Sequence, residues 1–143
     1  MRTRKSVYIE RPVADVFSYV ADMARHSEWR SELLSTEIVG DVHEGVGTHV
    51  RQRIAYQGRT LEANLEITDL VPGERICFRA HGGVHAHGCF DFSAEETGTR
   101  FEAMATVELK GALGMMERYI MQAIDRVADA DFERLKTVLE RGA

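Results

Sequence analysis

Apolar residues recur at every second position over the middle of the chain, from Leu34 to Leu109. This period is typical of strands that bury one face and expose the other. We expect six strands in this region and one more at residues 4–10, where Val7 and Ile9 point to the same side. Short turns that contain glycine separate the six strands, which favours antiparallel hairpins in sequence order.

Three other segments follow the helical period. Pro12 suits the first turn of a helix that ends near Ala21, and a short helical turn is expected to follow over Met23–Glu28. A long helix is expected over residues 113–141, and at about 1.5 Å per residue it can cross the whole sheet. The order of elements predicts an α+β fold: a curved seven-stranded antiparallel sheet wrapped around a long C-terminal helix, with two short helices after the first strand.

The polar faces of the expected strands fit the same arrangement. Hairpin turns at Gln57-Gly58 and Pro72-Gly73, with the next hairpin along the chain, bring opposite charges into register. The pairs are Arg53 with Glu62, Glu66 with Arg79, and Arg75 with Asp91. The outer face of the sheet is therefore expected to be a solvated lattice of charges.

Composition narrows the class of protein. The chain has 143 residues, of which 44% are hydrophobic and 29% charged, and this fits a single folded domain over residues 1–143. Disordered and collagen-like chains are excluded. The net charge of −5 argues against a protein whose main partner is nucleic acid. No apolar run resembles a signal peptide or a membrane span, so we expect a cytoplasmic protein.

The cysteines and some of the histidines meet on the outer face of the expected sheet. Cys77 lies opposite Cys89 in the expected register, and His85 and His87 share the face of Cys89. Thiolate and imidazole are zinc ligands by type, but the spacing matches no metal motif, so we expect no metal. In a reducing compartment we expect free thiols and not a cross-strand disulfide.

The opening of the chain resembles a known superfamily. The stretch from Ile9 to Asp22, followed by Met23–Trp29, is similar to the start of SRPBCC proteins, also called START-like or polyketide cyclase/dehydrase-like. Residues 66–75, 98–101 and 135–140 extend the resemblance over nearly the whole chain. It implies a helix-grip fold with a deep apolar cavity between sheet and long helix. Catalytic residues differ among the subfamilies, so the resemblance assigns none.

Small side chains on the inner faces leave room for such a cavity. They are Ala63, Ala80, Ala86, Gly88, Ala103 and Ala105 on strands, and Ala123 on the helix. The alternative is that neighbouring Met, Phe and Leu side chains fill the space. The implied cavity favours a ligand pocket. We expect its ligand-binding residues to be Trp29, Thr48, Gln52, Tyr56, Phe78, Phe90, Met116, Tyr119 and Ile120.

The polar members of this set are the candidates for orienting a ligand. Gln52 and Thr48 lie on an inner face, and a buried amide needs a partner, whether a ligand, a water or the backbone. Trp29, the only tryptophan, is a core plug, a wall of the cavity mouth, or both. His26 beside Glu28 is a candidate general acid or base, unless the two are simply polar residues of a solvated turn.

Three functions follow as hypotheses. The first is a bacterial protein that binds or transports a small hydrophobic ligand (lipid, aromatic or polyketide-like) in the cavity, with no cofactor. The second is an enzyme that resembles the polyketide cyclases and dehydratases. The third is a protein-interaction module. The sequence is also compatible with a homodimer.

Overall fold

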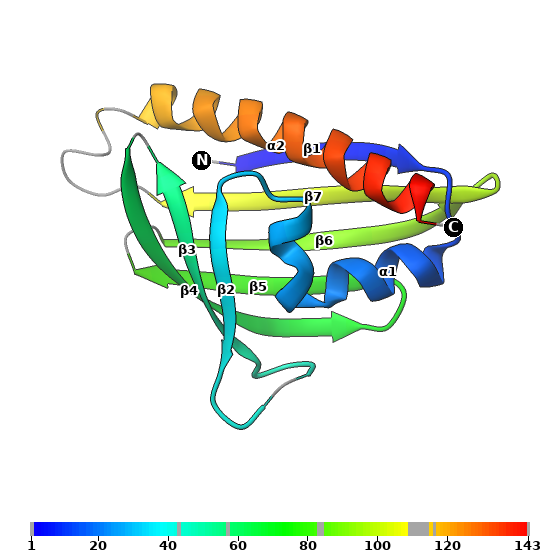
Figure 1. The fold of residues 1–143 in the computed structure, drawn as a ribbon, viewed down its shortest axis with the longest axis horizontal. Coiled ribbons are helices and arrows are strands. Elements are labelled where there is room, and N and C mark those ends of the chain that lie inside the picture. Colours follow the sequence, from blue (N-terminus) through cyan, green and yellow to red (C-terminus); the bar gives the residue numbers. More distant parts are fainter. Residues whose placement is uncertain are drawn as a thin grey trace.

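The computed structural model describes residues 2–42, 44–56, 58–82, 85–108, 115 and 117–142, and of residues 56, 82, 117 and 120 it describes the backbone alone. Figure 1 shows its elements. They are β1 (Arg2–Ile9), α1 (Val13–Ala21), the 3-10 helix η1 (Met23–Glu28), β2 (Leu33–Val39), β3 (His49–Tyr56), β4 (Arg59–Val71), β5 (Arg75–Gly82), β6 (His85–Glu95), β7 (Gly98–Glu108) and α2 (Glu117–Arg141). The predicted α+β class and the order of its elements are confirmed.

The seven strands form one antiparallel sheet in the order β1-β7-β6-β5-β4-β3-β2. Figure 1 shows the sheet curling, so that β2 and β3 stand across the direction of β5, β6 and β7. The register shifts by one residue between Ile67 and Asp69 in β4, and again between Leu33 and Ser35 in β2. Such bulges bend a strand and increase its twist. All three helices lie on the concave side that results.

The convex face carries the charge pairs that the strand pattern predicted. Each of the three predicted pairs lies directly opposite in the ladder, namely Arg53 with Glu62, Glu66 with Arg79, and Arg75 with Asp91. Of these, Arg75 and Asp91 form an ion pair with 2.6 Å between Nε and Oδ1. The pairs sit at the exposed surface, so they fix register more than they add stability.

The structure corrects the expectation of free thiols. Cys77 on β5 and Cys89 on β6 are directly paired across the ladder, as predicted, but their sulfur atoms are joined in a disulfide. The register was readable from the strand pattern, whereas the oxidation state was inferred from an assumed compartment. The disulfide links two neighbouring strands behind the concave face.

Reduction of this disulfide is expected to lower the free energy of unfolding by about 3 kcal/mol, because the cross-link closes a loop with a sequence separation of 12 and restricts the unfolded chain. Denaturant unfolding with and without a dithiol reductant measures the change. The double variant Cys77→Ser/Cys89→Ser is the control and should not respond to the reductant. Identical responses of wild type and variant would show that the disulfide does not form.

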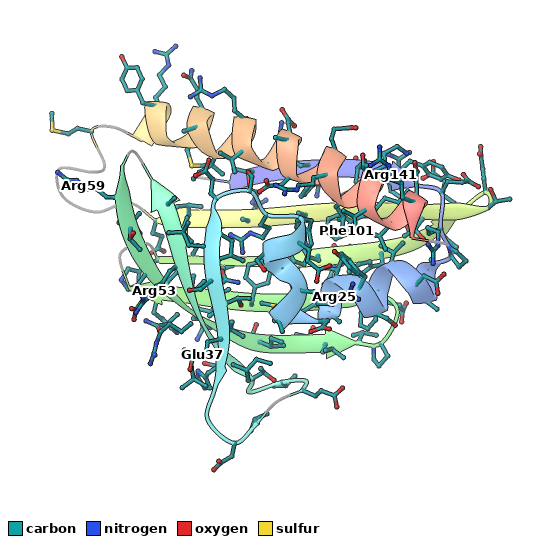
Figure 2. The ribbon with its side chains drawn as sticks, in the orientation of Figure 1. Arg25, Glu37, Arg53, Arg59, Phe101 and Arg141 are labelled. Carbon is teal, nitrogen blue, oxygen red and sulfur yellow. A yellow bond between two sulfur atoms is a disulfide. The ribbon has the colours of Figure 1, made fainter. Side chains whose placement is uncertain are left out.

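The packed half of the interior lies under the C-terminal half of α2. Phe101 on β7 and Leu135 on α2 are completely buried, and Phe132 packs on Phe101 with ring centroids 5.2 Å apart. Figure 2 shows Phe101 between the sheet and this part of α2. Ile9 and Val16 close the same cluster from β1 and α1. This half is a conventional core.

Leu135→Ala is expected to lower the free energy of unfolding by about 2–5 kcal/mol, because the buried site cannot collapse fully around the lost side chain. Tyr119→Ala on the same helix is the matched control, since Tyr119 is 69% exposed, and should change it by less than about 0.5 kcal/mol. Chemical denaturation measures both. Similar losses for the two variants would contradict this assignment of the core.

Candidate ligand site on the concave face

The burial of inward side chains on the concave face changes along strands β5, β6 and β7. Ile76, Phe92 and Phe101 are buried, whereas most inward residues further along the same strands are only half-buried, with Gly88 and Val107 as buried exceptions. The half-buried residues are Phe78, Ala80, Ala86, Phe90, Ala103 and Ala105. They lie at the end of these strands over which α2 begins (Figure 1). The described residues therefore leave apolar surface uncovered on this half of the face, which we call the apolar floor.

A polar wall adjoins the apolar floor. Trp29 follows η1 and is 2% exposed, and its ring lies 6.4 Å from that of Phe90, centroid to centroid. Gln52 on β3 is 1% exposed and points to the concave side. Arg30 connects the two, because its Nη1 donates a hydrogen bond of 2.9 Å to Oε1 of Gln52. We call Trp29, Arg30 and Gln52 the polar wall.

Two donors of the polar wall are buried and unused. Nε1 of Trp29 and Nε2 of Gln52 have no hydrogen-bond partner among the residues that the structure describes. Leaving a buried polar group unpaired costs about 1–3 kcal/mol, so folded proteins rarely retain such groups without a reason. The wall is thus prepared to donate hydrogen bonds to something that the described residues do not supply.

Arg30 is half-buried, and its charge is held there by an indirect arrangement. Burial lowers the pKa of Arg30, and the negative charge of Asp131 on α2 acts in the opposite direction. Asp131 is 6% exposed, and its Oδ1 accepts hydrogen bonds from the backbone N and the Oγ of Ser31, at 2.9 and 2.8 Å. These bonds fasten the segment after η1 to α2 and keep Arg30 and Gln52 in place.

The burial of His26 contradicts one of the two sequence interpretations, that of a polar residue in a solvated turn. The residue is 1% exposed. Its Nε2 donates to the backbone oxygen of Val20 at 2.8 Å, and burial lowers its pKa to about 4. The ring is therefore neutral at physiological pH, and its unprotonated Nδ1 is buried without a partner among the described residues. The geometry makes it a support for Trp29, whose ring centroid lies 5.2 Å away.

The structure brings together some of the predicted ligand-binding residues. Trp29, Gln52, Phe78 and Phe90 share the concave side. Thr48 is also buried there, but its Oγ donates to the backbone oxygen of Gly45 at 2.8 Å. The remaining predictions are placed differently. Tyr119 is 69% exposed, the side chains of Tyr56 and Ile120 lie outside the described part, and so does Met116 as a whole.

Arg30 and Asp131 were missed by sequence reasoning, for different reasons. Asp131 left a signal, because it falls between Val127 and Leu135 on the apolar stripe of the long helix, where a charge needs an explanation. Arg30 gave no such signal, because it lies in the loop between η1 and β2, where the sequence follows neither a helical nor a strand period.

Two hollows elsewhere are lined by described residues. One of about 230 Å³ lies between the start of β1 and α2, beside Lys5, Met121 and Asp125. The other, of about 170 Å³, lies at the β5–β6 end near His81 and His87. Within the part of the chain that the structure describes, no group of three or more His, Cys, Asp or Glu residues could hold a metal ion. No described helix is long and apolar enough to span a membrane.

A curved sheet that grips a C-terminal helix above a partly open apolar floor defines a helix-grip protein of the SRPBCC superfamily, as the resemblance predicted. More narrowly, residues 1–140 match the family described as polyketide cyclase / dehydrase and lipid transport, and the chain belongs to that family. No curated protein matches the sequence.

Solved structures share the fold at low sequence identity. A protein from Thermus thermophilus is 20% identical with a TM-score of 0.87, over 100% of this chain and 99% of that one. The Zhui aromatase/cyclase from Streptomyces sp. R1128 is 18% identical with a TM-score of 0.79, over 99% of this chain and 94% of that one. A START superfamily protein from Mycobacterium smegmatis is 14% identical with a TM-score of 0.80, over 99% of both chains.

The pH dependence of stability tests the state of His26. The unfolded chain binds a proton at His26 below about pH 6.5, whereas the folded protein resists protonation until about pH 4. The free energy of unfolding should therefore be highest above pH 6.5 and fall by roughly 3 kcal/mol as the pH drops to 4. Denaturant titrations between pH 7.5 and 4.5 measure the slope.

His26→Gln is the control for this measurement, because it keeps an N–H for the carbonyl of Val20 and cannot titrate. Its stability should vary less over the same range. Parallel curves for wild type and variant would mean that His26 does not carry the effect.

Proposed function

We propose that this protein binds a small hydrophobic ligand on the concave face, between the apolar floor and α2. The observation that carries the proposal is the pair of buried, unused donors on Trp29 and Gln52 beside half-buried aromatic rings. An apolar surface with a few convergent polar groups is the usual composition of a small-molecule site. Membership of a family described by both cyclase chemistry and lipid transport supports the proposal.

Apolar burial supplies most of the expected affinity. At about 25 cal/mol per Å², covering about 300 Å² of ligand and floor contributes roughly 7 kcal/mol before the cost of association. Phe78 and Phe90, whose ring centroids are 5.0 Å apart, offer a broad surface for an aliphatic chain or an aromatic ring. The polar wall then orients the ligand.

A cyclase or dehydratase is the second candidate, and Arg30 is the observation that favours it. A guanidinium in the interior stabilises an enolate oxygen, which is the charge that develops when an enolisable ketone cyclises. His26, the base considered from the sequence, is a weak base, because burial lowers its pKa to about 4. The Zhui aromatase/cyclase shows that the fold accommodates such chemistry in another protein.

Binding is tested with the protein's own tryptophan. Trp29 is the only tryptophan of the chain and belongs to the polar wall, so its fluorescence should change when a ligand covers the floor. We expect saturable changes with members of a panel of fatty acids, polycyclic aromatics and polyketide analogues, and a co-purified ligand in mass spectra of solvent extracts. Formation of cyclised product from an analogue would favour the enzyme.

Ala103→Leu adds bulk to the half-buried floor and should weaken binding about 10-fold or more, because the larger side chain overpacks the space for the ligand. Ala94→Leu on β6 is the matched control, since Ala94 is exposed and its replacement should leave affinity unchanged. The proposal is wrong if no member of the panel binds, or if both variants bind as the wild type does.

A further inference from the structure

The polar wall indicates the chemistry of the ligand's polar end. This inference rests on the proposed function. We propose that the ligand is an amphiphile whose apolar body covers Phe78 and Phe90 and whose polar end is a carboxylate held by Arg30, Gln52 and Trp29. Two observations support this assignment: the hydrogen-bond donors of the wall that have no partner among the described residues, and the positive charge of Arg30.

The amide of Gln52 can present only donors to a ligand. The guanidinium of Arg30 has donors and no acceptor, so the atom of Gln52 that it contacts must be the amide oxygen. The NH2 group is then the free end, and it is the atom found buried without a partner among the described residues. The indole of Trp29 is likewise only a donor, through Nε1. The wall therefore offers donors from all three of its residues.

Arg30 adds a positive charge that the described part of the chain leaves without a direct counterion. The one hydrogen bond that its guanidinium makes to a described residue is to neutral Gln52, and it forms no ion pair with any described residue. Asp131, whose charge acts on Arg30 from α2, uses its Oδ1 for two bonds to Ser31. A partly buried cation loses hydration that pairing can replace, and an anionic oxygen from a ligand would complete the pairing.

The buried acceptor close to the wall does not fit an anion. Nδ1 of His26 is buried without a partner among the described residues, and it can only accept a hydrogen bond while Nε2 donates to Val20. An alcohol or a neutral acid, which can donate, would suit that nitrogen, whereas a carboxylate would not. If the donors of the wall bind the head group, a carboxylate should bind more tightly than an alcohol. If Nδ1 of His26 binds it, the alcohol should bind more tightly.

Matched probes with one body and different head groups test the inference. The aliphatic arm uses decanoate, decanol, methyl decanoate and decylamine, and the aromatic arm uses 2-naphthoate, 2-naphthol and methyl 2-naphthoate. Affinities at pH 7.5 come from Trp29 fluorescence and from calorimetry. We expect the carboxylate of an arm to bind about 10-fold or more tightly than its ester and alcohol, and the amine to bind most weakly.

Variants assign the selectivity to the wall. Arg30→Met keeps much of the length of the side chain but removes the charge, and it should lower affinity for decanoate to that for the ester while leaving ester binding unchanged. Gln52→Met should reduce the preference in part. Arg53→Met is the matched control, because it removes a guanidinium from β3 on the exposed convex face, where Arg53 lies opposite Glu62. Thermal melts verify folding, and Arg30→Lys replaces Arg30→Met if the latter does not fold, with an intermediate preference expected.

The outcomes separate this inference from the proposed function. Carboxylate, ester and alcohol binding equally would overturn the inference and leave hydrophobic binding intact, with solvent occupying the donors. Tighter binding of the alcohol would overturn it in favour of His26 Nδ1. If no probe of either arm binds, the proposed function fails together with the inference.

Discussion

The structure depends on one geometric constraint, which is that a single long helix must cover the apolar face of seven strands. Seven strands at about 4.8 Å spacing make a sheet nearly 30 Å wide, whereas a helix with its side chains is only about 10–12 Å across. The sheet therefore curls, with bulges in β2 and β4 where the bend is taken up. The helices α1 and η1 cover part of what remains (Figure 1). A flat sheet of this size would leave a large apolar surface in water.

Uneven covering divides the interior into two halves. The C-terminal half of α2 is fixed by Leu135 in the core, and polar contacts reinforce it, because Nζ of Lys136 donates to the backbone oxygen of Tyr8 at 2.8 Å and Arg11 donates to that of Leu139 at 2.6 Å. At the other end, Tyr119 is exposed and the inward residues of β5–β7 are half-buried. The described core contacts are thus concentrated at the C-terminal end of the helix, although Met121 near its start is also buried.

The period of two was sufficient to predict the strands, their order and the registers of the convex face, because one-sided burial fixes which residues point inward. It also placed Gln52 on the inner face. The same reasoning could not find Arg30, whose position depends on how the connection after η1 packs against α2 through Ser31 and Asp131. Nor could it decide the state of Cys77 and Cys89, because register brings thiols together while the redox environment decides whether they are oxidised.

The two parts of the concave face contribute differently to recognition. Under the proposed function, the apolar floor would accommodate any hydrophobic body of suitable size and so supply affinity with little selectivity. The polar wall keeps buried donors on Trp29 and Gln52 that would be more stable if replaced by apolar groups of the same shape. Such donors are useful if a bound oxygen accepts their hydrogen bonds. A ligand without that oxygen leaves the donors unpaired and binds more weakly, so the donors discriminate between ligands. This fold is shared with a START superfamily protein and with an aromatase/cyclase, so the curled sheet and its helix do not by themselves determine function.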